Sequence, residues 1–351
     1  MQKNNFGINF FGTKNSHRSF QEVIDLLQKN INNFMIYLVI AGTDTSQIKG
    51  ISAAGINAEA RRETALADAE FFLYGASNNN NYKLPSLNAG VTPALISYVC
   101  SNLIDARTIV VPIGLKVKPC FDHLAIEDQF MGPAKCLSTG ESMPRERVLN
   151  LYERGIEIGK STKAPMLIAE SVPGGTTTAQ AVMEAFGLDV SNLVGSSMFK
   201  SPRELKRKVI QSGLSKANLK NDFDSLDVIS SIGDPFQAFS MGLLIGARLA
   251  KQSVVLSGGS QMLAVILLAL EFIDSKVKNE FIDFVFIATT GWLVKDNSLS
   301  VLLDLISKKH NVNLLGLASP LNFKSTRFKE LNDYEIGYVK EGVGAGGMSI
   351  L

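Results

Sequence analysis

Apolar runs recur along the chain, and stretches with a helical spacing of apolar and polar residues separate them. The runs cover residues 34–41, 70–74, 108–113, 165–169, 253–257, 281–288 and 313–318. They are apolar almost throughout instead of alternating with polar residues, which is typical of strands buried on both faces of a sheet. Strands that alternate with helices favour a doubly wound α/β fold, with a mainly parallel sheet and helices on both of its faces.

Capping signals predict where several helices begin. Residues 201–204 combine a capping serine, a proline at the first helical position and a glutamate three residues after the cap, and Gly213 should end that helix. Residues 92–93 and 234–235 pair a polar cap with a proline in the same way, so we interpret Asp234 as a helix cap in preference to a ribose ligand. A first helix is expected over residues 19–30.

No linker or internal repeat divides the chain. We assign residues 32–330 to one α/β nucleotide-binding domain, and residues 1–31 together with 331–351 to a small helical lid subdomain. Residues 121–143 lack a clear period, and irregular segments of that length in a compact domain tend to be lids or binding loops.

Charged residues make up only 19% of the chain, against 46% apolar residues. So little charge favours a large buried sheet, an apolar subunit interface, or both, and we expect a homodimer. The net charge is only +2 and the basic residues are scattered, which argues against a nucleic-acid partner.

The amino terminus lacks the features of a secretory signal. The most apolar run, residues 262–270, is shorter than the roughly 20 residues that a membrane-spanning helix needs. We therefore expect a soluble cytoplasmic protein with no membrane partner.

The cysteines, Cys100, Cys120 and Cys136, are odd in number and lack the spacing of metal-ligand pairs. This pattern predicts reduced thiols. A zinc site formed by Cys120, His123 and Cys136 within one irregular stretch is the alternative, and the missing ligand pairs argue against it. No metal site is therefore assigned.

A glycine-rich loop follows the predicted strand 165–169 and opens a predicted helix. It contains Gly174 and Gly175, followed by Thr176, Thr177 and Thr178. The glycines would let the backbone approach a ligand, and the threonines add hydroxyl donors at a helix amino terminus, a combination that suits a monophosphate. It matches neither the Walker loop nor the GxGxxG fingerprint. An ordinary turn between strand and helix, with a threonine cap, is equally consistent with the spacing.

Carboxylates accompany two glycine-rich segments. Glu170 lies at the carboxyl end of its predicted strand, where open α/β sheets bind ligands, although a contact with the helix dipole would also explain it. Glu341 lies among the glycines of residues 339–347, including Gly342 and Gly344, and a positioned carboxylate there can act as a general base. A flexible tail or a simple turn is the alternative.

A further glycine turn, with Gly258 and Gly259, joins a predicted strand to a predicted helix. The carboxyl ends of several parallel strands would then meet along one edge of the sheet, together with their small and polar residues. This convergence favours a ligand site at that edge.

At these residues the sequence resembles the nicotinate-nucleotide:dimethylbenzimidazole phosphoribosyltransferase family, which acts in assembling the lower nucleotide loop of cobalamin. Glu170 with residues 175–177 resembles the family's GNTT loop, and residues 341–345 resemble its carboxyl-terminal GEGTGAA-type loop. The likeness runs from about Pro165 to the end of the chain and is closest to a divergent archaeal and cyanobacterial branch. One departure is that Gly175 stands where the family pattern has an asparagine before the two threonines.

The resemblance implies a phosphoribosyl transfer from nicotinate mononucleotide to an aromatic base, dimethylbenzimidazole or a related base such as adenine. The product would be an α-riboside phosphate for the cobamide lower ligand. The 5′-phosphate would lie on residues 174–178, Glu341 would take the proton that the base releases, and Glu170 would orient the ribose or the nicotinate. Because the leaving group is a cationic pyridinium, no metal or cofactor is implied.

Two other functions fit the same residues. One is a non-catalytic nucleotide-binding or regulatory paralogue, and the other is a nicotinate-nucleotide hydrolase in which water replaces the base. The family also leads us to expect a closing helix after the second loop. The sequence stops at Leu351, so we expect either that this lid is reduced or that the chain is truncated there.

Overall fold

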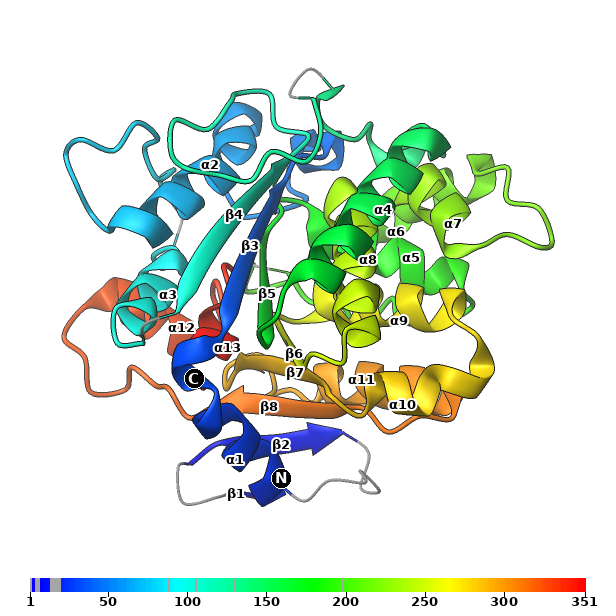
Figure 1. Cartoon of the computed structure of the whole chain (residues 1–351). Helices are drawn as coiled ribbons and strands as arrows, with labels where there is room; N and C mark the ends of the chain where they lie inside the picture. Colours follow the sequence, from blue (N-terminus) through cyan, green and yellow to red (C-terminus); the bar gives the residue numbers. More distant parts are fainter. Residues whose placement is uncertain are drawn as a thin grey trace.

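A computed structural model describes residues 7–12, 20–87, 89–104, 106–128, 131–196 and 198–351, together with the backbone of residues 2–3. Its strands are β1 (Gln2–Lys3), β2 (Asn9–Gly12), β3 (Met35–Ala41), β4 (Arg107–Ile113), β5 (Met166–Ser171), β6 (Val254–Ser257), β7 (Val285–Thr290) and β8 (Leu315–Ser319). The described strands form one sheet in the order β1-β2-β8-β7-β6-β5-β3-β4 (Figure 1). Neighbours from β8 to β4 are parallel, whereas β1 and β2 are antiparallel additions at one edge.

Helices pack on both faces of this sheet, as predicted. One face carries α4 (Arg145–Ser161), α5 (Gly175–Ala185), α6 (Arg203–Lys216), α7 (Ser225–Ile232), α8 (Pro235–Leu249), α9 (Ser260–Phe272) and α11 (Ser298–His310). The other carries α1 (Phe20–Lys29), α2 (Ala58–Tyr74), α3 (Ala94–Ser101) and α13 (Ala345–Met348). Side chains of β5 alternate between these two cores: Ile168 belongs to the first and Leu167 to the second. The predicted doubly wound, mainly parallel α/β fold is confirmed.

One predicted strand is wrong. Residues 70–74 form the last turn of α2, which begins after Asn57, whose side chain accepts a hydrogen bond from Ala60 N. A five-residue apolar run is too short to distinguish a strand from the buried end of a helix. A second prediction starts too early, because residues 281–282 belong to α10 (Lys278–Ile282) and β7 begins only at Val285.

Helix ends follow the capping signals only in part. Asp234 caps α8 as predicted, and its side chain accepts a hydrogen bond of 3.1 Å from Gln237 N. Gly213 does not end α6: the helix continues to Lys216, and Gly213 lies where a Cβ would overlap the carbonyl oxygen of Leu137. Close packing therefore explains this glycine. The predicted cap at residue 201 is also displaced, since α6 starts at Arg203. The first helix, predicted over residues 19–30, is observed as α1 (Phe20–Lys29), and residue 19 lies outside the described residues.

The described part of the irregular segment 121–143 is anchored beside the sheet. Glu127 accepts hydrogen bonds from Arg147 of α4 and from Gly114 N, which follows β4. Within the described chain, no group of three or more His, Cys, Asp or Glu side chains is placed to hold a metal, so the zinc alternative finds no ligand cluster. The division into a main domain and a lid subdomain stays a prediction.

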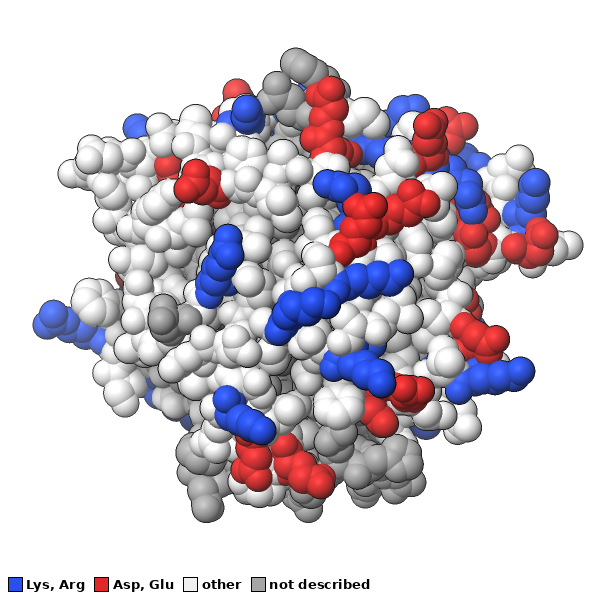
Figure 2. All heavy atoms as spheres, viewed as in Figure 1, with Lys and Arg blue, Asp and Glu red and all other residues white. Residues whose placement is uncertain are grey.

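The charged side chains on the face seen in Figure 2 are interspersed in sign, and few lie over α2, β4 and α3. Tyr74, Val99 and Leu103 at this end of the molecule are more than half exposed. A homodimer stays a prediction. No described helix is long and apolar enough to cross a membrane.

Candidate active site

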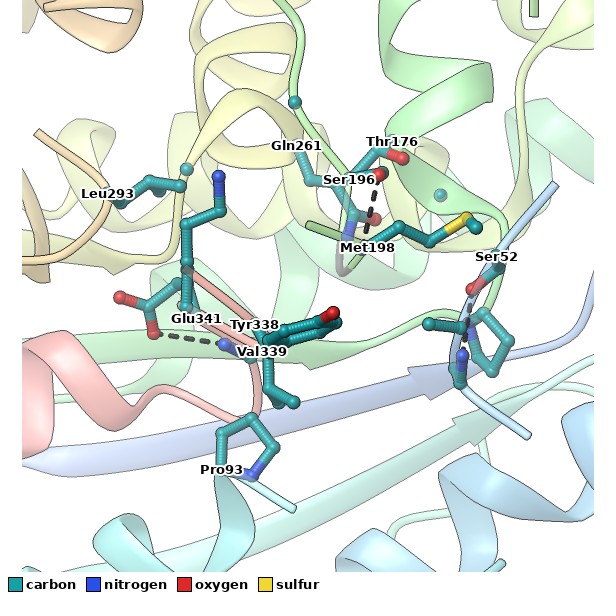
Figure 3. A pocket seen from close by; sticks show the side chains of 18 of the residues that line it. Ser52, Pro93, Thr176, Ser196, Met198, Gln261, Leu293, Tyr338, Val339 and Glu341 are labelled. Carbon is teal, nitrogen blue, oxygen red and sulfur yellow. Dashed lines mark hydrogen bonds between the residues drawn. The ribbon is translucent and has the colours of Figure 1, made fainter. Parts of the chain in front are cut away.

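A cavity of about 580 Å³ opens at the carboxyl ends of β5 and β6. It brings together most of the predicted site residues: Glu170, Gly174, Gly175, Thr176, Gly259, Glu341 and Gly342. Thr177, Thr178, Gly258 and Gly344 are not among the residues that line it. Figure 3 shows Thr176 and Gln261 toward one side of the cavity, and Glu341 and Val339 toward the other, above Pro93.

The first glycine loop forms the end of the cavity that suits an anion. Gly174 precedes the first residue of α5 with a φ of +85°, a left-handed conformation that favours glycine. Thr176 lies in the first turn of the helix and lines the cavity. The backbone N–H groups of a helix amino terminus attract phosphate oxygens, so this geometry suits a phosphate.

The next two threonines point elsewhere. Thr177 and Thr178 are fully buried, and the Thr178 hydroxyl donates to Oδ2 of Asp234 at 2.5 Å and to the carbonyl oxygen of Gly175 at 2.9 Å. These two hydroxyls therefore lie behind the loop, in the protein interior, and do not face the cavity. Their residue type predicted donors, but the helix rotates them away from the ligand side.

Lys206 is a candidate that the sequence analysis missed. This residue of α6 is fully buried, and its Nζ donates to Thr176 Oγ1 at 3.0 Å and to the carbonyl oxygen of Gly195 at 2.7 Å. Burial lowers its pKa to about 7, and no carboxylate of the described residues pairs with it. A signal was present, because Lys206 shares helical spacing with the buried Val209, Ile210 and Gly213.

Glu170 lies at the end of β5 with only 6% of its surface exposed. Burial, reinforced by the charge of Glu341, raises its pKa to about 8, although hydrogen bonds from Val172 N and the Gln261 side chain oppose the shift. The carboxyl group is therefore mostly protonated at neutral pH and can donate a hydrogen bond into the cavity.

Glu341 is held at the end of β7 by four donors. Its Oε2 accepts from Thr289 Oγ1 at 2.9 Å and from Thr290 N at 2.7 Å. Its Oε1 accepts from Gly342 N and Gly346 N, each at 3.1 Å. Burial raises the pKa of Glu341 despite these four hydrogen bonds, which lower it. A fixed carboxylate with a raised pKa suits a general base.

The second glycine loop packs tightly against the sheet. Gly346 lies where a Cβ would overlap the backbone of Thr289, and Gly344 has a φ of +77° with its carbonyl oxygen bonded to Ser257 Oγ at 2.9 Å. Val343 N donates to the carbonyl oxygen of Glu170 at 2.8 Å and so joins the two loops. Gly344 and Gly258 therefore shape the backbone around the cavity without lining it.

Between the two loops the lining is largely apolar. It includes Val91, Pro93, Leu193, Met198, Leu293, Leu299 and Val339. The rings of Phe199 and Tyr338, which also line the cavity, stack with centroids 5.5 Å apart. An apolar cavity with few polar groups at its ends is the usual form of a site for a small organic ligand.

The chain is similar to known proteins in sequence and in fold. The profile of a family described as phosphoribosyltransferase matches residues 90–282. A UPF0284 protein of Prochlorococcus marinus strain MED4 is 76% identical over 351 residues, which cover 100% of this chain and 91% of that protein. A UPF0284 protein of Gloeothece citriformis is 37% identical over 330 residues, 92% of this chain and 87% of that protein.

Two crystal structures from Thermus thermophilus share the fold. One is described as CobT, with a TM-score of 0.62 and 16% identity over 97% of this chain and 89% of that chain. The other is a nicotinate-nucleotide-dimethylbenzimidazole phosphoribosyltransferase, with a TM-score of 0.63 and 17% identity over 97% of this chain and 88% of that chain. On the family match and its relatives, the chain belongs to the nicotinate-nucleotide:dimethylbenzimidazole phosphoribosyltransferase family.

Proposed function

We propose that this protein transfers the phosphoribosyl group of nicotinate mononucleotide to an aromatic base, dimethylbenzimidazole or a related base. The product is an α-riboside phosphate for the lower ligand of a cobamide. The observation that carries the proposal is that one cavity contains both the amino terminus of α5, beside a buried lysine, and the carboxylate of Glu341. The first suits a phosphate, and the second suits proton removal from a base.

The phosphate end combines backbone groups with the positive charge of Lys206. Gly174 and Gly175 let the ligand approach the first turn of α5, and Thr176 adds a hydroxyl group. Lys206 acts through Thr176, since its Nζ holds the threonine hydroxyl and brings a positive charge behind it. A phosphate in this position would give the lysine the anionic partner that the described residues do not supply.

The reaction needs one bond to form and one to break. A ring nitrogen of the base attacks C1′ with its lone pair, on the side opposite the nicotinate. The bond from C1′ to nicotinate breaks, and its electron pair neutralises the pyridinium nitrogen. Attack from the opposite side inverts C1′, which gives the α-riboside. Because the leaving group departs neutral at its nitrogen, the transfer requires no metal or cofactor.

Glu341 takes the N–H proton that the base loses from its other ring nitrogen when the attacking nitrogen bonds to C1′. Its Oε1 has the two longer hydrogen bonds, both of 3.1 Å, so this oxygen is the one that can give up a donor most easily and accept the proton. Glu170, protonated at neutral pH, donates a hydrogen bond to a ribose or nicotinate oxygen. The apolar lining between the two loops shelters the flat base.

The test is to incubate the purified protein with nicotinate mononucleotide and, in parallel, dimethylbenzimidazole, adenine or no acceptor. Nicotinate release and riboside phosphate formation are followed by chromatography and mass spectrometry. Base-dependent release together with an α-riboside phosphate supports the transferase. Release without any base indicates a hydrolase, and nucleotide binding without release indicates a non-catalytic binding protein.

A further inference from the structure

Asp68 is a buried carboxylate in the cavity wall that the mechanism above does not use. It belongs to α2, lines the cavity and is only 6% exposed. Its Oδ1 accepts a hydrogen bond of 2.6 Å from Thr92 Oγ1, and its Oδ2 accepts one of 2.8 Å from Ser171 Oγ. Among the residues that the structure describes, no Lys, Arg or His forms an ion pair with it.

Two hydroxyl donors leave this carboxylate incompletely satisfied. Each carboxylate oxygen can accept two hydrogen bonds, and each oxygen of Asp68 has one protein donor. A buried carboxylate without a cation is costly, and every missing hydrogen bond adds to that cost. Burial raises the pKa of Asp68 to about 6, so at neutral pH the group is still mainly ionised and acts only as an acceptor. It therefore lacks donors, and the cavity is the side from which a ligand can supply them.

The position of Asp68 assigns it to the base and not to the phosphate. Helix α2 packs in the core on the face of the sheet opposite that of α5. The side chain of Ser171 reaches Asp68 from the end of β5, next to Glu170.

Asp68 also lies on the same side of the cavity as Glu341. Thr92, whose hydroxyl donates to Asp68, is followed by Pro93, and a Cβ on Gly342 would lie 3.3 Å from the Pro93 ring. The segment of Thr92 and Pro93 therefore connects Asp68 with the loop that carries Glu341. A base that loses its proton to Glu341 would therefore have Asp68 within the walls of the same subsite.

We propose that Asp68 selects acceptor bases that carry an N–H or O–H donor on the edge remote from the attacking nitrogen, as aminopurines and hydroxybenzimidazoles do. This inference rests on the proposed phosphoribosyl transfer and narrows its acceptor. Dimethylbenzimidazole presents methyl groups on that edge, which would leave the buried carboxylate without a partner. A site built to bond a donor discriminates strongly against an analogue that lacks it.

The experiment compares bases that match in shape and differ in the donor. The wild-type protein is given nicotinate mononucleotide with adenine or 6-methylpurine, and with 5-hydroxybenzimidazole or 5-methylbenzimidazole. Within each pair we expect kcat/KM to be about 10- to 100-fold higher for the base with the donor, as for a hydrogen bond to a charged group. Equal values within both pairs would overturn the proposal.

Variants assign the preference to Asp68. In Asp68→Asn the ratio within each pair should fall below about threefold, because the amide no longer acts purely as an acceptor. In Asp25→Asn, which alters an exposed aspartate of α1, the ratio should stay at the wild-type value. If Asp68→Asn retained the full preference, the proposal would be overturned. The role of Asp68 would then be structural, to join α2 to Thr92 and to β5 through its two hydrogen bonds. Asp68→Ser provides the same test if the asparagine variant does not fold.

A failure of the proposed function can be told apart from a failure of this inference. If no base supports nicotinate release in the wild type, phosphoribosyl transfer is refuted, and calorimetric binding of the same base pairs then tests Asp68 alone. Tighter binding of the donor base in the wild type, lost in Asp68→Asn, supports the inference without turnover. Equal affinities within each pair overturn it.

Discussion

Replacing Lys206 by methionine should stabilise the free protein and weaken its binding of nicotinate mononucleotide. Burial lowers the pKa of Lys206 from 10.5 to about 7. In the unfolded chain the lysine keeps its proton up to about pH 10, so between pH 7 and pH 10 the unfolded state binds more protons than the folded one. The stability of the wild type therefore rises with pH in this window, and at pH 7 and below the buried ammonium costs about 4 kcal/mol.

Methionine removes this cost but leaves two acceptors unpaired, Thr176 Oγ1 and the carbonyl oxygen of Gly195. Each lost partner costs about 1–2 kcal/mol, so the net gain at pH 7 should be up to about 2 kcal/mol, or a few degrees in Tm. Because the cost in the wild type falls by about 1.4 kcal/mol per pH unit above pH 7, the advantage of the variant should vanish by about pH 9. Chemical denaturation at pH 7 and pH 9 measures both effects.

The same pKa sets the pH dependence of nucleotide binding. A phosphate monoester becomes a dianion above about pH 6, while Lys206 is charged only below about pH 7. If phosphate binding requires the charged lysine behind Thr176, affinity should fall about 16-fold between pH 7 and pH 8.5, the ratio of the protonated fractions. Lys206→Met should lose this pH dependence and bind about 10- to 100-fold more weakly at pH 7.

Lys208→Met is the matched control, since Lys208 lies on the same helix with 71% of its side chain exposed. It should retain the wild-type stability, affinity and pH dependence. Calorimetric titration with nicotinate mononucleotide at several pH values decides the outcome. If Lys206→Met bound the nucleotide as tightly as the wild type and with the same pH profile, the phosphate would lie elsewhere and the reasoning would be refuted.

Three further substitutions test the remaining parts of the site. Glu341→Gln should reduce turnover at least about a hundredfold and leave nucleotide affinity nearly intact, and equal turnover in steady-state assays would remove Glu341 from the mechanism. Gly175→Val should weaken nucleotide binding, because its Cβ would overlap the Gln261 side chain, which donates a hydrogen bond to Glu170. An unchanged calorimetric affinity would show that the phosphate does not bind at the first glycine loop. Glu170→Gln should keep most of the activity, because glutamine donates as the protonated acid does. With saturating nucleotide, which removes the effect of Lys206 on binding, the wild-type kcat should fall above about pH 8 and the variant's should not, so parallel kcat profiles would contradict a protonated Glu170.

The strands could be predicted because a strand buried on both faces leaves an unbroken apolar run in the sequence. The runs at 34–41 and 165–169 became β3 and β5 within one or two residues. The error at 70–74 has the same origin, since five apolar residues also fit the buried end of a helix whose cap, Asn57, lies well upstream. Gly213 shows a second limit: the need for a glycine there is set by Leu137, which is distant in sequence.

The site was predictable where local chemistry was unusual. Glu170 and Glu341 could be found because each accompanies glycines at a strand end or loop, and both line the cavity. Thr177 and Thr178 were included on residue type alone, and the rotation of the helix places them in the interior. Asp68 was missed because the burial of a charged side chain is a property of the assembled fold, whereas the helical spacing of Lys206 with buried residues was a usable signal.

The buried ionisable groups around the cavity share one feature that bears on its function. The pKa values of Glu170 and Asp68 are raised and that of Lys206 is lowered, in every case because burial disfavours the charged form. A protein selected for stability alone would replace such groups with apolar ones of similar size. A ligand with a phosphate and with hydrogen-bond donors would give Lys206 and Asp68 the partners they lack, so part of the cost held in the free protein would be recovered on binding. If Lys206→Met were more stable and bound the nucleotide more weakly, the cost of burying the charged lysine would be recovered when the nucleotide binds.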